Sequence, residues 1–177
     1  MTRWVALFRG INVGKAKRVA MADLRALLAL QGCSDVQTLL NSGNAVFDAL
    51  LRSPATRAQQ IQTAVQTQLG VASAVILKSA PEIDAVVAAY PFGDEVDDPS
   101  RTLVVLTADA ASLAALRPIV DGEWGAGAQL MSEHALYLWC PDGILQSKAA
   151  LALNRLRVAC TSRNWATLLK IQALLNR

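Results

Sequence analysis

Residues 3–18 read RWVALFRGINVGKAKR, and the interpretation of the whole chain depends on this stretch. Its first six residues are typical of a β-strand, in which successive side chains point to opposite faces. Trp4, Ala6 and Phe8 would lie on one face, and Val5 and Leu7 on the other. Because both faces are apolar, we expect this strand to be covered on both sides.

A basic loop with two glycines follows the strand. It carries four cations within ten residues, and the first acid in the chain is Asp23. Gly10 and Gly14 allow the backbone to turn its N–H groups toward an anion, and Arg9 and Lys15 flank them. A nucleoside triphosphatase loop needs four residues between its glycines and a Ser or Thr after the lysine, whereas this chain has three and an alanine, so we exclude that function. The loop is interpreted as one wall of an anion-binding surface; the alternative is an ordinary loop with solvated cations.

The order of the predicted elements occurs twice along the chain. Strands are expected at 3–8, 36–40, 45–48 and 74–77, with helices at 21–31 and 56–69; strands recur at 102–107, 127–131, 135–140 and 158–161, with helices at 109–116 (closed by Pro118) and 147–156, and a last helix follows at 164–175. This pattern predicts an α+β fold of two ferredoxin-like (β-α-β-β-α-β) units in tandem plus a C-terminal helix. The first unit is expected at 1–80. A linker helix at 81–89, the second unit and the C-terminal helix are expected within 81–177.

Composition limits the function classes. The chain has 177 residues, of which 53% are hydrophobic and 18% charged, which is typical of a globular protein with a real core. Its longest uncharged run, residues 58–77, contains five glutamines and is not expected to cross a membrane. Since the first apolar run is too short for a signal peptide, we expect a soluble, cytoplasmic protein. A sister unit or a second subunit could cover the open face of each sheet, so a homodimer is one expectation.

Charge is distributed unevenly. Residues 1–80 carry nine Lys/Arg and three Asp/Glu, residues 81–142 carry two and eleven, and residues 143–177 carry six and none. If the two basic segments meet in space, they can attract anions; otherwise the opposite charges pair with one another.

Few residues in the sequence are candidates for catalysis or for metal binding. His134 is the only histidine and is expected in a turn, so a Cys-His or Ser-His pair would have no second histidine to draw on. Cys33, Cys140 and Cys160 are far apart in apolar surroundings, which indicates reduced, buried thiols. No cluster has metal-ligand spacing, so we expect no metal and no cofactor.

Three further segments carry polar residues at turns and helix starts. The sequence Asn-Ser-Gly-Asn at 41–44 predicts a turn held by side-chain-to-backbone hydrogen bonds or, alternatively, a ligand contact. From topology we place this turn at the end of the sheet opposite the basic loop. Ser147 and Lys148 begin one predicted helix, and Arg163 and Asn164 precede the last one. Serine is a good helix cap, whereas a cation at a helix start is unfavourable unless an anion binds there.

These motifs together resemble a bacterial family of proteins of unknown function, domain-of-unknown-function family 1697. The likeness covers essentially the whole chain and rests on Arg9-Gly10-Ile11-Asn12-Val13-Gly14, Met21, Leu24, Ser42-Gly43-Asn44, Pro91-Phe92, Tyr137-Leu138, Pro141-Asp142-Gly143, Ser147-Lys148 and Thr161-Ser162-Arg163-Asn164-Trp165. The resemblance implies two ferredoxin-like units and no biochemical activity. Ala166 stands where the family usually has Asn, so a ligand contact by that amide would be missing here.

The leading hypothesis is a protein that binds a small phosphate- or carboxylate-bearing ligand. The candidate ligand-binding residues are Arg9, Asn12, Lys15, Ser42, Asn44, Ser147, Lys148, Arg163 and Asn164. One alternative is a nucleic-acid-binding module that contacts phosphates alone, because the aromatic pattern of an RNA-recognition motif is missing. The other is an enzyme acting on a phosphorylated substrate, for which the sequence offers no evident general base. Catalytic residues remain unassigned.

Overall fold

The protein consists of two compact units. The computed structural model describes residues 1–14, 18–93 and 98–177; the first unit comprises Met1–Ile83 and Ile171–Arg177, and the second comprises Asp84–Lys170. The sequence interpretation instead divides the chain after residue 80 and assigns the last helix entirely to the second unit. The last seven residues group with the first unit, where the Arg3 Nε donates a hydrogen bond to the Leu174 carbonyl oxygen (3.3 Å).

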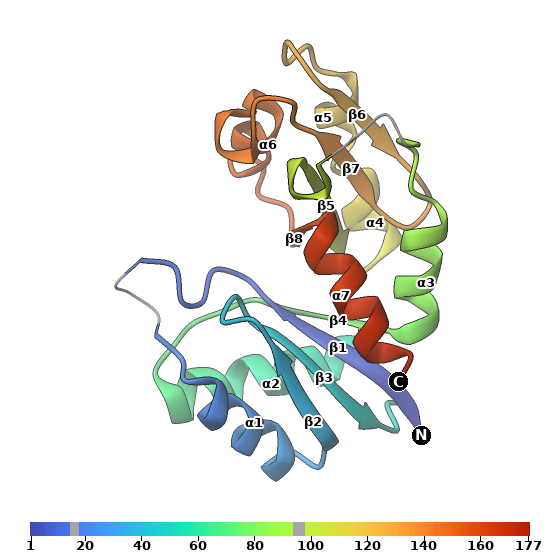
Figure 1. The fold of residues 1–177 in the computed structure, drawn as a ribbon. Helices are drawn as coiled ribbons and strands as arrows, with labels where there is room; N and C mark the ends of the chain where they lie inside the picture. Colours follow the sequence, from blue (N-terminus) through green and yellow to red (C-terminus); the bar gives the residue numbers. More distant parts are fainter. Residues whose placement is uncertain (15–17, 94–97) are drawn as a thin grey trace. The chain divides into compact units, whose positions relative to one another are not determined.

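The first unit contains a four-stranded antiparallel sheet with two helices on one face (Figure 1). Its strand order is β2-β3-β1-β4, the ferredoxin-like order. The elements are β1 (Thr2–Phe8), α1 (Met21–Leu30), β2 (Ser34–Leu39), β3 (Asn44–Ala49), α2 (Pro54–Leu69) and β4 (Val75–Ser79).

Local sequence explains where helix α2 begins and ends. Ser53 is its N-cap, and the Ser53 hydroxyl accepts a hydrogen bond from the Thr56 backbone N–H (3.3 Å). Pro54 occupies the first turn, where the missing N–H costs nothing. Gly70 ends the helix with φ = 69°, a left-handed conformation that glycine adopts without strain.

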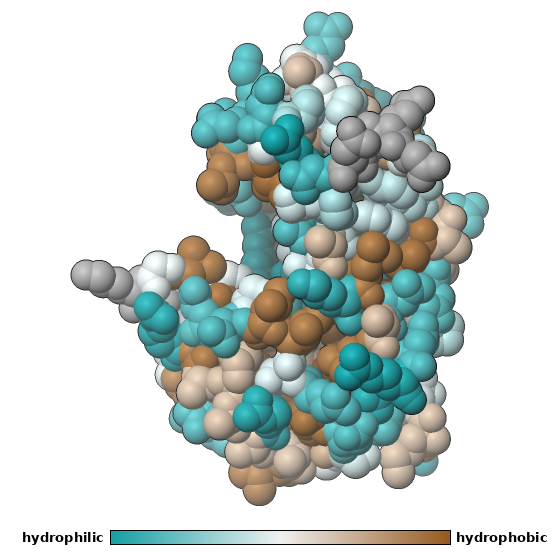
Figure 2. Space-filling view, viewed as in Figure 1, coloured by the Kyte–Doolittle hydropathy of each residue, from teal (hydrophilic) through white to brown (hydrophobic). Residues whose placement is uncertain are grey.

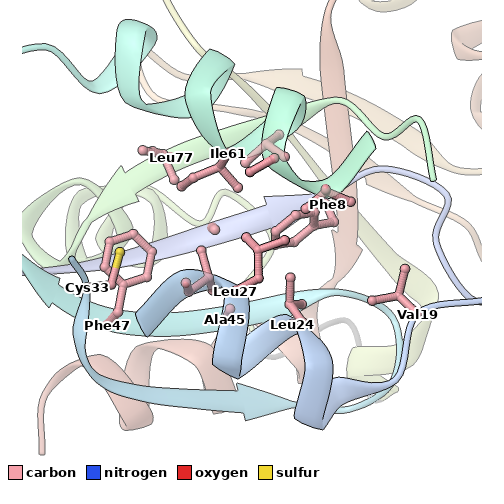
Figure 3. Packing of buried hydrophobic residues seen from close by; sticks show 14 of the residues in the cluster. Phe8, Val19, Leu24, Leu27, Cys33, Ala45, Phe47, Ile61 and Leu77 are labelled. Carbon is pink, nitrogen blue, oxygen red and sulfur yellow. The ribbon is translucent and has the colours of Figure 1, made fainter. Parts of the chain in front are cut away.

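The core of the first unit lies between this sheet and its two helices. Figure 3 shows Leu24 and Leu27 of α1 and Ile61 of α2 packed over the sheet. The other face of β1 is also buried, since Val5 and Leu7 have no exposed surface. The prediction that β1 is covered on both sides is therefore confirmed. On the visible face, exposed apolar residues are interspersed with hydrophilic ones (Figure 2).

The second unit has the same strand order. Its sheet runs β6-β7-β5-β8, with all neighbouring strands antiparallel, so the prediction of two ferredoxin-like units in tandem is confirmed. Its elements, with the helices α3 and α7 that continue into the first unit, are α3 (Ala80–Ala88), η1 (Pro99–Arg101), β5 (Thr102–Thr107), α4 (Ala110–Ala114), α5 (Arg117–Asp121), β6 (Ala128–Met131), β7 (Leu136–Trp139), η2 (Ile144–Gln146), α6 (Lys148–Leu153), β8 (Cys160–Asn164) and α7 (Trp165–Leu175).

Two local predictions in this unit were wrong. Pro118 does not close a helix; it lies in the first turn of α5, where proline is tolerated. Strand β8 extends to Asn164 instead of ending at Thr161, because Arg163 pairs with Val104 of β5.

Aromatic residues hold the connection after α3 to the second sheet. The Tyr90 ring stacks on Trp165, with ring centroids 3.9 Å apart, and meets Phe92 edge to face. The Tyr137 hydroxyl donates a 2.6 Å hydrogen bond to the Val86 carbonyl oxygen. This buried bond fixes the second half of α3 within the unit.

Candidate functional site

Three connections meet at one end of the first sheet. Leu7 near the end of β1 pairs with Asn44 at the start of β3, and Phe8 pairs with Val75 at the start of β4. The basic loop, the β2–β3 turn and the α2–β4 connection therefore emerge together. The prediction that the turn lies at the opposite end was wrong, because β1 and β2 are both antiparallel to β3 and so end on the same side.

The basic loop and the turn pack against each other through Ile11 and Gly43. Ile11 is only 1% exposed and belongs to the core of the first unit. A Cβ atom added at Gly43 would lie 2.7 Å from the Phe8 Cβ and 2.8 Å from the Ile11 side chain. Only glycine fits this close approach, and its φ of 85° is a conformation that other residues rarely adopt. Gly43 thus lets the turn lie directly on the loop.

The Asn12 side chain ties the loop together. Its amide nitrogen donates to the carbonyl oxygens of Val19 (2.9 Å) and Asn41 (2.8 Å), and its amide oxygen accepts from the Val19 N–H (2.8 Å). Val19 is itself buried in the core, beside Leu24 in Figure 3. Asn12 therefore has a structural role that its sequence position did not reveal, and it fixes both ends of the loop relative to the turn.

The backbone of the loop alternates between two conformations. Gly10, Asn12 and Gly14 have positive φ angles of 70°, 55° and 63°, whereas the φ angles of Ile11 and Val13 are not positive. Alternation of this kind can direct successive N–H groups toward one side, an arrangement called a nest, which in other proteins holds anions. Within the described part of the chain, the N–H groups of residues 10–14 make no hydrogen bond of standard geometry, although residues 11 and 12 form a turn. A Cβ atom at Gly10 or Gly14 would meet nothing within 4 Å, so the loop surface is open.

Two arginines adjoin this nest. Arg9 is half-buried; its backbone bonds to Ala74 and Ser73, but its guanidinium has no partner among the residues that the structure describes. Arg18 is exposed and directly precedes Val19, which Asn12 holds against the loop. Lys15, which the sequence analysis included in the site, lies outside the described residues.

Ser42 and Asn44 have structural partners. Asn44 is fully buried, and its amide nitrogen donates to the Leu39 carbonyl oxygen (2.9 Å) and to the Ser42 hydroxyl (3.1 Å). These bonds are those of a turn held by side-chain-to-backbone contacts, the first of the two alternatives given for this segment. Neither residue adds a charge to the site.

The remaining candidates gather at one end of the second sheet. β7 and β8 end on the same side, since Thr102 pairs with Trp139 and Leu103 with Asn164. The Ser147 hydroxyl caps α6 by accepting from the Ala150 N–H (3.2 Å).

The other candidates at this end of the second sheet are Asn164 and Lys148. The Asn164 amide oxygen accepts from the Thr167 N–H (2.8 Å) at the start of α7. Lys148 is exposed and lines a hollow of about 150 Å³ together with Ser147 and residues 140–143. The two caps are protein contacts, and Lys148, on a short helix, makes no ion pair with the residues that the structure describes.

Arg163 is buried inside the second unit. It is 8% exposed, and its guanidinium donates to the Thr161 hydroxyl (3.0 Å) and the Ser162 carbonyl oxygen (2.7 Å). Burial lowers the pKa of Arg163 to about 10, because desolvation disfavours the charged form. These contacts indicate a structural arginine.

No other chemistry stands out in the described residues. All three cysteines are free and buried, and burial raises the pKa of the Cys33 and Cys140 thiols. Among residues 1–14, 18–93 and 98–177, no group of three or more His, Cys, Asp or Glu side chains is placed to hold a metal ion. In the same residues, no helix has the length and apolar character needed to span a membrane.

The fold thus defines an α+β protein built from two ferredoxin-like units, and the candidate site is a basic loop at one end of the first sheet. The chain belongs to the family described as "Protein of unknown function (DUF1697)", whose model matches residues 1–137. Its fold is similar to that of the solved conserved bacterial protein SP0830 from Streptococcus pneumoniae, with a TM-score of 0.81 at 23% identity over 98% of each chain. No curated protein matches this chain.

Proposed function

We propose that this protein binds a small anionic ligand at the Arg9–Gly14 loop. The observation that supports this most directly is the alternating backbone of residues 10–14, whose N–H groups make no hydrogen bond of standard geometry within the described protein. A backbone that already has its binding conformation loses little conformational entropy on binding. The proposal does not include Arg163, Ser147 or Asn164, because these side chains already hold the fold together.

Charge supports the same site. Arg9 and Arg18 are near the nest, and no acid occurs in the sequence between Arg9 and Asp23. A hydrogen bond between a guanidinium and an anion contributes about 1.5–3 kcal/mol, which corresponds to roughly a tenfold to hundredfold change in affinity. Recognition of this kind requires no metal ion.

The test is an anion titration of the purified protein by calorimetry and thermal melting. Phosphate should raise the melting temperature more than chloride does at equal ionic strength. Arg9→Ala and Arg18→Ala should each weaken phosphate binding about tenfold or more. The control is Arg52→Ala, which removes an exposed cation that follows β3 at the other end of the same sheet. Equal responses of the wild type to phosphate and chloride would refute the proposal.

A metabolite-library thermal-shift screen would then identify the natural ligand. Short single-stranded RNA, titrated at two salt concentrations, tests the nucleic-acid alternative, since phosphate contacts made by several cations give a steep salt dependence. RNA that binds more tightly than any small anion, with such a dependence, would favour that alternative.

A further inference from the structure

We propose that the group recognised by the Arg9–Gly14 loop is the dianion of a phosphate monoester, rather than a carboxylate or a phosphodiester. This inference rests on the proposed function and goes one step further, because it names the chemical class of the ligand. It follows from which hydrogen-bonding groups the loop offers and which it lacks.

The loop offers donors and no side-chain acceptor. The N–H groups of residues 10–14 make no hydrogen bond of standard geometry in the described protein, and the Arg9 guanidinium adds further donors. Asn12 is the one residue of 9–14 whose side chain has an acceptor, and its amide oxygen already accepts from the Val19 N–H. A ligand group that carries a proton, such as a monoanionic phosphate with its P–OH, would find no free side-chain acceptor in residues 9–14, so its O–H would bond to water instead. The site therefore favours a fully deprotonated group.

The number of donors favours phosphate over carboxylate. A carboxylate presents two oxygens in one plane, whereas a phosphate monoester dianion presents three terminal oxygens arranged around the phosphorus atom. Successive N–H groups on a curved backbone match the second arrangement better. Two arginines, Arg9 and Arg18, also match the double negative charge.

A phosphodiester matches the loop less well in both its number of terminal oxygens and its charge. It carries one negative charge, and proteins that bind single-stranded nucleic acids combine phosphate contacts with aromatic side chains on which bases stack. The aromatic residues of the first unit are Trp4, Phe8 and Phe47, and all three are buried in its core. A stacking surface beside the loop is therefore missing from the described part of this unit.

The ligand's own ionisation gives this inference a specific signature. The second pKa of a phosphate monoester is about 6, so the dianion is the main species at pH 7.5 and a minor one at pH 5. Within the described residues 9–14 and 18–23, the charged side chains are Arg9, Arg18 and Asp23; the turn 40–43 and the connection 70–74 contribute none. The single histidine, His134, belongs to the second unit. A pH dependence between 5 and 7.5 would thus come from the ligand.

The experiment measures the affinities of methyl phosphate, dimethyl phosphate, succinate and sulfate by calorimetry at pH 5.0 and 7.5. Methyl phosphate should bind most tightly at pH 7.5 and about tenfold more weakly at pH 5.0, following the loss of its dianion. Sulfate, which stays a dianion, should show no comparable change.

A backbone variant tests whether the nest itself binds the ligand. Gly10→Ala forces a Cβ onto a residue with φ = 70° in open space, and Gly32→Ala does the same at φ = 81° after α1. Methyl phosphate affinity should fall at least fivefold in Gly10→Ala and stay within about twofold of wild type in Gly32→Ala, because only the first residue belongs to the nest. Equal losses in both variants would overturn the assignment to the backbone.

The outcomes separate the two proposals. If dimethyl phosphate or succinate binds as tightly as methyl phosphate, the inference fails while the anion-binding function stands. If methyl phosphate binds equally at both pH values, the preference for the dianion is refuted. If none of the four anions binds, the proposed function itself fails.

Discussion

Replacing Asn12 by alanine should destabilise the first unit strongly for a loop substitution. The change removes three hydrogen bonds of 2.8–2.9 Å, two to Val19 and one to the Asn41 carbonyl oxygen. Each contributes about 0.5–1.5 kcal/mol net, with the exposed Asn41 bond at the lower end because water replaces it. Alanine also tolerates the φ of 55° less well than asparagine, at about 1 kcal/mol. The total loss is about 3 kcal/mol.

This loss should be measured by urea unfolding followed by circular dichroism. A change of about 3 kcal/mol corresponds to a decrease in melting temperature of roughly 6–12 °C for a chain of this size. The matched control is Asn41→Ala, because only the main chain of Asn41 takes part in the bridge, and this variant should remain within about 0.5 kcal/mol of the wild type. If Asn12→Ala is as stable as that control, Asn12 does not hold the loop to the turn.

Four other predictions follow from the fold. Gly43→Ala should cost about 2–4 kcal/mol in urea unfolding, because the new Cβ overlaps neighbours at 2.7–2.8 Å in a left-handed conformation; a cost below about 1 kcal/mol would contradict the packing. Tyr137→Phe should cost about 1–3 kcal/mol by the same measurement, because it leaves the buried Val86 carbonyl oxygen without its donor. A thiol reagent should label none of the three cysteines in the native protein and all of them in denaturant, and rapid native labelling would show that a thiol is accessible. The hydrogen bond from Arg3 lowers the pKa of Asp35. The Asp35 carboxylate therefore stabilises the fold above its unfolded pKa of about 3.9, and this stabilisation is lost as the pH falls through the lower pKa of the folded state. Melting temperatures measured from pH 5 to 2.5 should fall less steeply for Asp35→Asn than for the wild type.

Much of the fold follows from local patterns in the sequence. The continuous apolar run of residues 4–8 is sufficient to predict a strand that is buried on both faces, because successive side chains point to opposite faces. The Asn-Ser-Gly-Asn turn and Gly70 mark element ends through their backbone preferences. Repetition of this order along the chain then predicts two units of one topology, which the strand orders confirm.

The candidate site was harder to predict because it depends on contacts between distant residues. Gly43 and Ile11 are 32 positions apart, and nothing local indicates that one packs on the other. In the sequence, the Asn12 side chain is an amide that could contact a ligand. In the structure, this amide makes three hydrogen bonds within the fold. Arg163 looks like a cation at a helix start, whereas its strand register places it in the interior. Burial and partner choice of polar residues are properties of the tertiary structure.

The division of the chain into two units also affects when the parts of the first unit come together during synthesis. The first unit consists of Met1–Ile83 and Ile171–Arg177, and the bond between Arg3 and Leu174 joins residues 171 positions apart. During synthesis, the unit that leaves the ribosome first therefore remains incomplete until the residues around 174 have also emerged. The four strands of its sheet lie within residues 2–79 and can pair early, but the Arg3 side chain gains its bond to Leu174 only after the second unit has been translated.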